Sequence, residues 1–416
     1  MPQGRAGVGD EAAERSHDSR RVAVLVPSMD GGGAERSMFN LCRGLIARGH
    51  RVDMLVCRTE GNLNGQVPAG ARFVALRRAS TVRGRIAALR ADPGALPVLA
   101  RPMLLPWKSP WSLRYLPALA RYLGESRPDV LLAGIPFFNL IALWARRRSG
   151  VDTRVVVTER STLSVNIAIR EGQWRRRFLP PLLRRTYAWA DAIVAVSNGV
   201  ADDLARATRI PRERIRTVYN PVVTPDLHER AKAPLAHPWF APGMPPVILG
   251  VGEFVESKDF PTLFRAFARV RRSRPARLVI LGKGKPERHA LVISEVERLG
   301  IGRDVDLPGW VDNPFAYMAR ASVFVLSSIY EGLPGVLIQA LACGCPVVST
   351  DCQSGPAEIL SHGRYGRLVA VGDDEAMAQA ISETLDAAPD RARLRARGAE
   401  FSIERVLDDS VNALFG

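Results

Sequence analysis

The chain has 416 residues, 47% of them hydrophobic and 24% charged, a globular composition too long for one common core, so we expect two domains. The net charge of +16 is concentrated in residues 1–222, which favours an anionic partner; because no nucleic-acid-binding signature accompanies it, nucleic acid is excluded. Five cysteines without a CxxC pair indicate a reducing compartment and argue against a structural metal.

Short apolar runs alternate with helical patterns through the first half of the chain. Residues 1–20 lack an apolar centre and are predicted to be a disordered tail rather than a signal peptide. The apolar run 130–145 is too short to span a bilayer and predicts a strand followed by a helix. A helix is predicted after Gly33, ending near Gly49. Strands are predicted at 21–27, 52–57, 72–76, 130–134, 154–158 and 192–197.

A proline-rich stretch at 223–246 is predicted to be a linker. After it the alternation starts again, with strands at 247–251, 277–281, 305–308 and 323–326, and helices at 262–272, 287–299, 314–321 and within 373–415. This pattern predicts an α/β protein with two doubly wound parallel sheets. We expect domains at 21–222 and 247–395, and a C-terminal helix at 396–416 that packs back on the first domain.

Residues 331–360 carry the most functional information. Glu331 follows an apolar strand and a Ser-Ser-Ile-Tyr turn, and the small residues Gly332, Pro334 and Gly335 then open an apolar helix. A helix N-terminus at the carboxyl edge of a sheet presents free N–H groups and receives phosphate. The Glu331 carboxylate can accept hydrogen bonds from sugar hydroxyls, and Gln339, two helical turns on, can bind a second diol such as a ribose. The alternative is an ordinary βα unit with a chance glutamate.

This stretch resembles the Glu-x7-Glu signature of the retaining glycosyltransferase family 4, with Gln339 in place of the second Glu. The order of motifs resembles that family over roughly residues 21–400. The resemblance implies the GT-B fold, which is two Rossmann-like domains facing across a cleft. It implies transfer of a hexose or N-acetylhexosamine from a nucleotide sugar, a UDP-sugar, to a glycan. Glu331 and Lys258 are then the catalytic candidates, and the same stretch supplies donor-binding residues Gly332, Leu333, Pro334, Gly335, Val336 and Gln339.

The resemblance also assigns roles to three glycine-rich loops. Gly32 and Gly33 match a loop that lies against the donor's sugar and diphosphate, although any tight turn between a strand and a helix can carry glycines. Gly282 follows a predicted strand, where a loop facing the ligand is expected. Val311, after Gly309 and Trp310, matches the segment that holds the base; Trp310 itself is as consistent with packing as with stacking.

The loop after strand 247–251 departs from the family pattern, which is Gly-Arg-x4-Lys with both cations on the diphosphate. Lys258 matches the lysine, and a plain surface lysine is the alternative. Glu253 stands where arginine is usual. A carboxylate beside a diphosphate is repelled by about 1–4 kcal/mol, so we expect Glu253 to turn away or another cation to compensate. The resemblance implies no metal or other cofactor and no dedicated nucleophile, because the leaving phosphate assists substitution on the same face.

The end of strand 154–158 faces the cleft in the family arrangement. Many members carry a histidine here and this chain does not, so Glu159 or Arg160 is expected to orient the acceptor or the donor. A plain ion-pair role for Arg160 is equally consistent with the sequence.

Two segments, 104–115 and 173–187, interleave cations with Trp, Phe and Leu, and the second includes Trp174 and Arg175–Arg177. This composition suits the headgroup region of an anionic membrane, while a solvated basic helix face is the alternative. We therefore expect a cytoplasmic protein, peripherally bound to the inner face of the cytoplasmic membrane. Its acceptor would be a polyprenyl-pyrophosphate-linked glycan, in lipopolysaccharide or exopolysaccharide synthesis.

Two functions of other classes remain open. A sugar-nucleotide epimerase of the same fold would interconvert a UDP-sugar without an acceptor. A non-catalytic, donor-binding partner in a glycan assembly complex is suggested by Glu253 and Gln339, which both depart from the family pattern.

Overall fold

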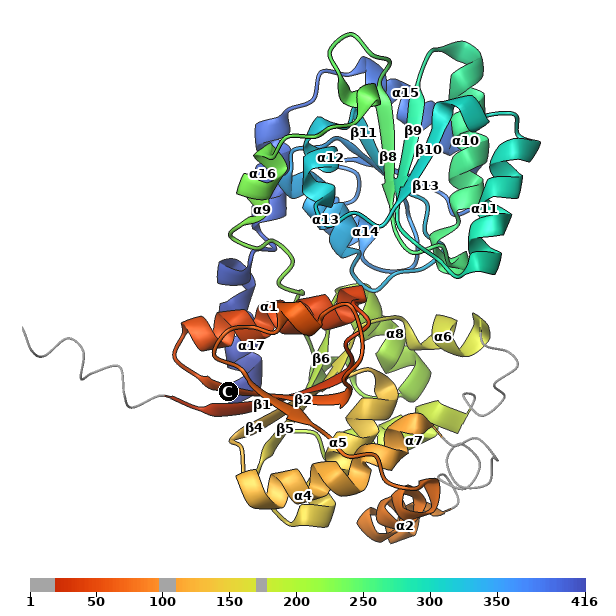
Figure 1. Ribbon diagram of the computed structural model, residues 1–416. Coiled ribbons are helices and arrows are strands. Elements are labelled where there is room, and N and C mark those ends of the chain that lie inside the picture. The colour runs from red at the N-terminus through yellow and green to blue at the C-terminus, as the bar shows by residue number, and fades with distance from the viewer. Residues whose placement is uncertain (1–18, 97–109, 170–177) are drawn as a thin grey trace, which may run out of the picture. The chain divides into compact units, whose positions relative to one another are not determined.

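The computed structural model describes residues 19–96, 110–169 and 178–416 (Figure 1). Most of the predicted tail lies outside these residues, as do Trp174 and Arg175–Arg177 of the basic, aromatic segments. The chain folds into two compact units. Unit 1 contains residues 1–157, 185–192 and 414–416, and unit 2 contains 158–184 and 193–413. The predicted domain limits stay predictions, because these units interleave along the chain.

A seven-stranded sheet has the order β3-β2-β1-β4-β5-β6-β7. Strand β1 pairs in parallel with both β2 and β4. Every residue of β4 and seven of the eight in β1 are buried, as expected for strands covered by helices on both faces. The strands are β1 (Arg21–Ser28), β2 (Arg51–Arg58), β3 (Arg72–Ala75), β4 (Val130–Gly134), β5 (Arg154–Glu159), β6 (Ala192–Ala195) and β7 (Ile215–Thr217).

Helices follow these strands in alternation, so the predicted α/β class is confirmed. Helix α5 begins at a proline, which suits the first helical turn because its missing N–H has no acceptor there. The helices are α1 (Gly33–Ala47), α2 (Thr81–Ala91), α4 (Leu116–Ser126), α5 (Pro136–Ser149), α6 (Leu163–Ile169), α7 (Leu179–Tyr187) and α8 (Asn198–Thr208).

A six-stranded parallel sheet in unit 2 has the order β10-β9-β8-β11-β12-β13. The last residues of β8 and β9, Val251 and Leu281, are register partners. Because all strands point the same way, the loops that follow them gather at one edge of the sheet. The strands are β8 (Val247–Val251), β9 (Arg277–Leu281), β10 (Val305–Gly309), β11 (Val323–Leu326), β12 (Val347–Thr350) and β13 (Arg367–Val369).

The helices of the second half begin with α9, which lies inside the stretch predicted to be a linker. They are α9 (Leu227–Lys232), α10 (Phe260–Ser273), α11 (Pro286–Arg298), α12 (Pro314–Arg320), α13 (Gly335–Ala342), α14 (Pro356–Ile359), α15 (Asp374–Asp386), α16 (Arg391–Ala399) and α17 (Ile403–Phe415). The final residues of α17 belong to unit 1, where the Phe415 ring centroid lies 5.0 Å from that of His50.

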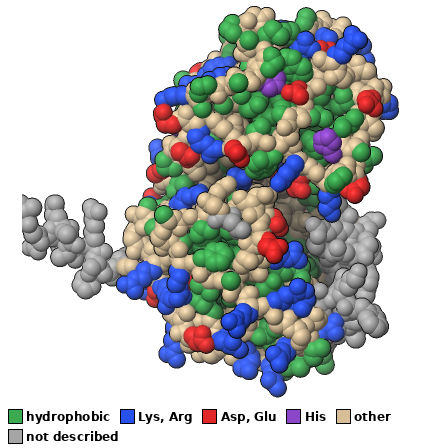
Figure 2. All heavy atoms as spheres, in the orientation of Figure 1, with side chains coloured by type: hydrophobic (Ala, Val, Ile, Leu, Met, Phe, Trp, Pro, Cys, Tyr) green, Lys and Arg blue, Asp and Glu red, His purple; other side chains and the backbone are tan. Residues whose placement is uncertain are grey.

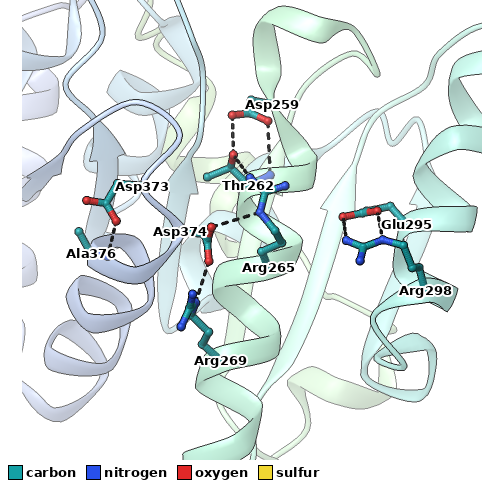
Figure 3. A network of polar contacts seen from close by, with 9 residues as sticks. All are labelled: Asp259, Thr262, Arg265, Arg269, Glu295, Arg298, Asp373, Asp374 and Ala376. Atoms are coloured by element: carbon teal, nitrogen blue, oxygen red, sulfur yellow. Dashed lines mark hydrogen bonds and ion pairs between the residues drawn. The ribbon is translucent and has the colours of Figure 1, made fainter.

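Charged groups join α10 to α15 on the outside of the second sheet (Figure 3). The Asp374 carboxylate accepts hydrogen bonds from Arg265 at 3.2 Å and Arg269 at 2.7 Å. Burial would raise the pKa of Asp374, but the hydrogen bonds from Arg269 and Arg265 outweigh it and hold the pKa below its ordinary value. On its other face α10 buries Phe264 and Phe267 in the core.

Candidate active site

An ion pair joins two loops at the carboxyl edge of the second sheet. Lys258 ends a short 3-10 helix after β8, and Glu331 follows β11. The lysine Nζ lies 2.5 Å from Glu331 Oε1, and the two side chains are 21% and 15% exposed. Ser328 Oγ donates to the same Oε1 at 2.8 Å. The other oxygen, Oε2, has no hydrogen-bond partner among the described residues, so it is available to a ligand.

Buried hydroxyl groups fix the backbone of these two loops. Ser327 Oγ donates to the carbonyl of Lys258 at 2.7 Å, and Thr350 Oγ1 donates to the carbonyl of Ser328 at 2.6 Å. Ser354 Oγ donates to the carbonyl of Glu331 at 2.7 Å. Ser327 follows the last residue of β11, Thr350 ends β12, and Ser354 lies in the loop after β12. These hydroxyls hold the carboxylate and the ammonium in place before any ligand binds. The sequence alone did not point to them.

Small or buried residues open α13, at the turn where a phosphate-binding site is predicted. Gly332 is buried, and a Cβ at its position would overlap the carbonyl oxygen of Arg160. Leu333 and Pro334 are also buried. The Pro334 carbonyl accepts from the amides one helical turn later, at 337 and 338. The amides of Gly335 and Val336 have no acceptor among the described residues. Two free N–H groups therefore stand at the helix N-terminus.

Gly282 is explained by packing between loops. A Cβ at Gly282 would overlap the carbonyl oxygen of Gly252. The Gly282 amide donates to the Gly309 carbonyl at 2.8 Å, and the Phe254 amide donates to the Lys283 carbonyl at 2.9 Å. The loops after β8, β9 and β10 are thus held together by their backbones, and glycine is needed where they approach most closely.

Two of the predicted site residues depart from the family pattern, Glu253 in the loop after β8 and Gln339 on α13. Glu253 is exposed and forms no ion pair or hydrogen bond through its carboxylate with any other described residue. Gln339 on α13 is half-buried, and its side-chain amide makes no hydrogen bond within the described ranges. Trp310 is 49% exposed, with Lys283 Nζ 5.2 Å from its ring centroid, and Val311 beside it is half-buried.

Glu159 and Arg160 lie at the end of β5 and belong to unit 2. The Glu159 side chain is buried, and its carbonyl accepts from the amide of Val196 at 3.1 Å. Arg160 Nη1 donates to Asn220 Oδ1 at 2.9 Å. The predicted role of this pair in orienting acceptor or donor stays a prediction.

The predicted glycine loop of unit 1 leads into helix α1. Gly32 is the N-cap residue of α1, and Gly33 is its first residue. A Cβ at Gly33 would meet no atom within 4 Å, whereas Gly31 has a φ of +97° that favours glycine. The open surface at Gly33 is compatible with the close approach of a ligand.

The described part of the chain offers neither a metal cluster nor a membrane span. Within residues 19–96, 110–169 and 178–416, no cluster of His, Cys, Asp or Glu could hold a metal ion. The same ranges contain no helix with the length and hydrophobicity that crossing a membrane requires. The prediction that no metal is needed stays a prediction.

Two parallel-sheet Rossmann-like domains, with a lysine, a carboxylate and a helix N-terminus at one sheet edge, define the GT-B class of α/β proteins. The family models agree with this class. "Glycosyltransferase Family 4" matches residues 31–225, and "Glycosyl transferases group 1" matches residues 245–387. The chain belongs to glycosyltransferase family 4, and it is a transferase enzyme.

Two relatives among curated proteins are bacterial glycosyltransferases. The chain is 32% identical over 285 residues to N-acetylgalactosamine-N,N'-diacetylbacillosaminyl-diphospho-undecaprenol 4-alpha-N-acetylgalactosaminyltransferase of Campylobacter jejuni, covering 67% of this chain and 74% of the relative. It is 35% identical over 224 residues to the lipopolysaccharide core biosynthesis glycosyltransferase LpsE of Rhizobium meliloti, covering 52% of this chain and 62% of that protein.

Among solved structures, the chain is similar to Anabaena HepE in complex with UDP-glucose. The TM-score is 0.72 at 17% identity, and the match covers 95% of this chain and 100% of that one. At this identity the likeness shows the fold alone.

Proposed function

We propose that the protein is a retaining glycosyltransferase that moves a hexose or N-acetylhexosamine from a UDP-sugar to a lipid-linked glycan. The observation that carries the proposal is the pair of Lys258 and Glu331, in which the ammonium and the Ser328 hydroxyl share one carboxylate oxygen and leave the other for a ligand. The free N–H groups of Gly335 and Val336 supply an anion-binding helix end in the same loop region.

In this proposal, Lys258 stabilises the diphosphate as it leaves. Its ammonium has three donors, so it can hold Glu331 and a phosphate oxygen together. The bond from the anomeric carbon to the diphosphate breaks, and an acceptor hydroxyl forms the new bond on the same face. The hydroxyl proton passes to the departing phosphate oxygen. Charge stabilisation by groups already in place would supply most of the acceleration.

Glu331 and Gln339 would bind the two ends of the donor. The free Oε2 of Glu331 can accept hydrogen bonds from sugar hydroxyls, and its charge strengthens them. Gln339 can both donate to and accept from the ribose hydroxyls, although a neutral amide binds them more weakly than a carboxylate. The exposed Glu253 would lie near the diphosphate without a cation to neutralise it.

The names of the relatives support the class of acceptor. The Campylobacter relative is named for an acceptor joined to undecaprenol through a diphosphate, and the Rhizobium relative for lipopolysaccharide core biosynthesis. We therefore place this enzyme in cell-surface polysaccharide synthesis, at the inner face of the cytoplasmic membrane, where lipid-linked acceptors are exposed to cytoplasmic nucleotide sugars.

The test incubates the purified protein with single UDP-sugars, each with and without undecaprenyl-diphosphate-linked oligosaccharides, and follows products by mass spectrometry. We expect one sugar added to one acceptor, with release of UDP. Glu331→Gln should abolish transfer. Glu256→Gln, which changes an exposed carboxylate in the short 3-10 helix that Lys258 ends, should not. Interconversion of a UDP-sugar alone would favour an epimerase. UDP-sugar binding by calorimetry without turnover on any acceptor would favour the non-catalytic function suggested by Glu253.

A further inference from the structure

Helix α2 of unit 1 rests on the protein through its smallest residues. Gly84, Ala88 and Ala91 are buried. A Cβ at Gly84 would overlap the backbone carbonyl of Leu113, in the 3-10 helix Trp111–Tyr115. The helix therefore lies close against its neighbour without using large apolar side chains.

The large apolar side chains of α2 point outward instead. An α-helix turns by about 100° per residue, so Val82, Ile86 and Leu89 lie on the face opposite the buried residues. Val82 is 62% exposed and Ile86 is 43% exposed, while Leu89 is half-buried. This is the reverse of an ordinary surface helix, whose apolar side faces the core.

Arginines flank this outward apolar face on both sides. By the same helical geometry, Arg83 and Arg90 lie along one edge and Arg85 along the other. Residues 76–91 contain five arginines and no Asp or Glu. The following acid, Asp92, is buried and bonded to Arg185 at 2.7 Å.

Four of the five arginines on α2 or just before it have no ion pair with another described residue. These four are Arg77, Arg78, Arg83 and Arg90. Figure 2 shows Lys and Arg side chains around the lower edge of unit 1, where Figure 1 places α2, with hydrophobic side chains among them.

We infer that α2 is an interfacial helix that docks unit 1 on an anionic lipid surface. Apolar side chains on the outer face of a helix, bordered by arginines, match the boundary between acyl chains and phosphate headgroups. The long arginine side chains can reach headgroup phosphates while Val82 and Ile86 enter the apolar layer. A single-stranded nucleic acid fits less well, because base stacking needs aromatic side chains and α2 has none.

This inference rests on the proposed function for its purpose, since docking would bring the enzyme to a lipid-linked acceptor. The physical basis for docking lies in α2 and its surroundings alone. The binding test therefore needs no turnover, and the two proposals can fail separately.

The test is co-sedimentation of the full chain with vesicles of phosphatidylcholine alone or of phosphatidylcholine and phosphatidylglycerol in a three-to-one mixture. We expect binding to the anionic vesicles that weakens with salt. Val82→Ser/Ile86→Ser and, separately, Arg83→Ser/Arg90→Ser should each weaken it roughly tenfold or more.

Matched controls come from unit 2, on surfaces that the inference does not use. Leu291→Ser/Ile293→Ser removes two apolar side chains of α11 that are 60% and 38% exposed. Arg303→Ser/Arg405→Ser removes two exposed arginines. Both control variants should bind like the wild type, and thermal melting should show that every variant is folded.

Equal binding of the wild type and the Val82→Ser/Ile86→Ser variant would overturn the inference, as would equal binding to both kinds of vesicle. A third result would also overturn it: the wild type does not bind vesicles, and sedimentation velocity detects a dimer in the wild type but not in this variant. A second copy of the chain would then cover the apolar face. A second measurement, UDP release from the donor in the absence of vesicles, separates loss of docking from loss of catalysis. A variant that loses binding but keeps this release supports docking, and a wild type that binds vesicles but turns over no donor refutes only the proposed function.

Discussion

Replacing Ser328 by alanine tests whether the Glu331 carboxylate must be held in place. In the structure, the Ser328 hydroxyl donates to Glu331 Oε1 at 2.8 Å and is fully buried. A hydrogen bond to a charged group contributes about 1.5–3 kcal/mol. Because Lys258 also holds Oε1, at 2.5 Å, we expect the loss of the Ser328 hydrogen bond to destabilise the transition state by the lower end of this range. That corresponds to about a tenfold fall in kcat/KM.

The assay measures UDP release at varied donor concentration with a fixed acceptor. A carboxylate that is misplaced, but still bound to Lys258, should lower kcat more than it raises the donor KM. The matched control is Ser294→Ala on α11, whose hydroxyl donates to a carbonyl of its own helix at 3.0 Å on the protein surface. This control should keep wild-type kinetics. A folded Ser328→Ala enzyme within twofold of the wild-type kcat/KM would refute the reasoning.

Three further changes test other parts of the account. Gly282→Ala should lower the free energy of unfolding, measured by denaturant titration, by about 3 kcal/mol, because the new methyl overlaps a neighbouring backbone carbonyl. The control is Gly302→Ala, where there is room for a methyl. Similar stabilities of the two variants would count against the explanation. Asp374→Asn should cost about 1 kcal/mol at neutral pH. The folded-state pKa of Asp374 lies below its usual 3.8. The stability difference between the wild type and Asp374→Asn should therefore have its whole value above pH 3.8 and shrink as the pH falls through the lowered pKa. A stability difference that grows in acid would contradict the assignment. Glu253→Arg should lower the donor KM several-fold by removing a like charge from the diphosphate, whereas Glu256→Arg should not, and an unchanged KM in both would place Glu253 away from the donor.

Most of the fold could be predicted because its central strands are continuous apolar runs. The predicted strands 130–134, 247–251, 277–281 and 323–326 have the observed limits. Strands β7, β12 and β13 had no predicted residue range. Strands β7 and β13 have three residues each, contain arginine and lie at sheet edges, whereas β12 is a buried strand of four residues. Short edge strands are partly polar, so their sequences lack the signal that buried strands carry.

The site was predictable where chemistry dictates the residue type, and less so where packing does. The charges of Lys258 and Glu331 and the glycines around them stand out in the sequence. Their ion pair could not be predicted, because it joins residues 73 positions apart and depends on β8 and β11 being neighbours in the sheet. Ser328 and Ser354 were missed because serine is common in loops. The available signal was their place at or beyond the ends of buried strands.

The most direct test of the central claim, that the Glu331 and Lys258 site transfers a sugar to a lipid-linked glycan, is mass spectrometry of lipid-linked glycans in a strain that lacks this protein. The account predicts that a glycan accumulates at the length reached before this transfer. The wild-type chain should restore the longer product, and Glu331→Gln, expressed at the same level, should not. Restoration by Glu331→Gln, or a glycan pool that the deletion leaves unchanged, would contradict the account.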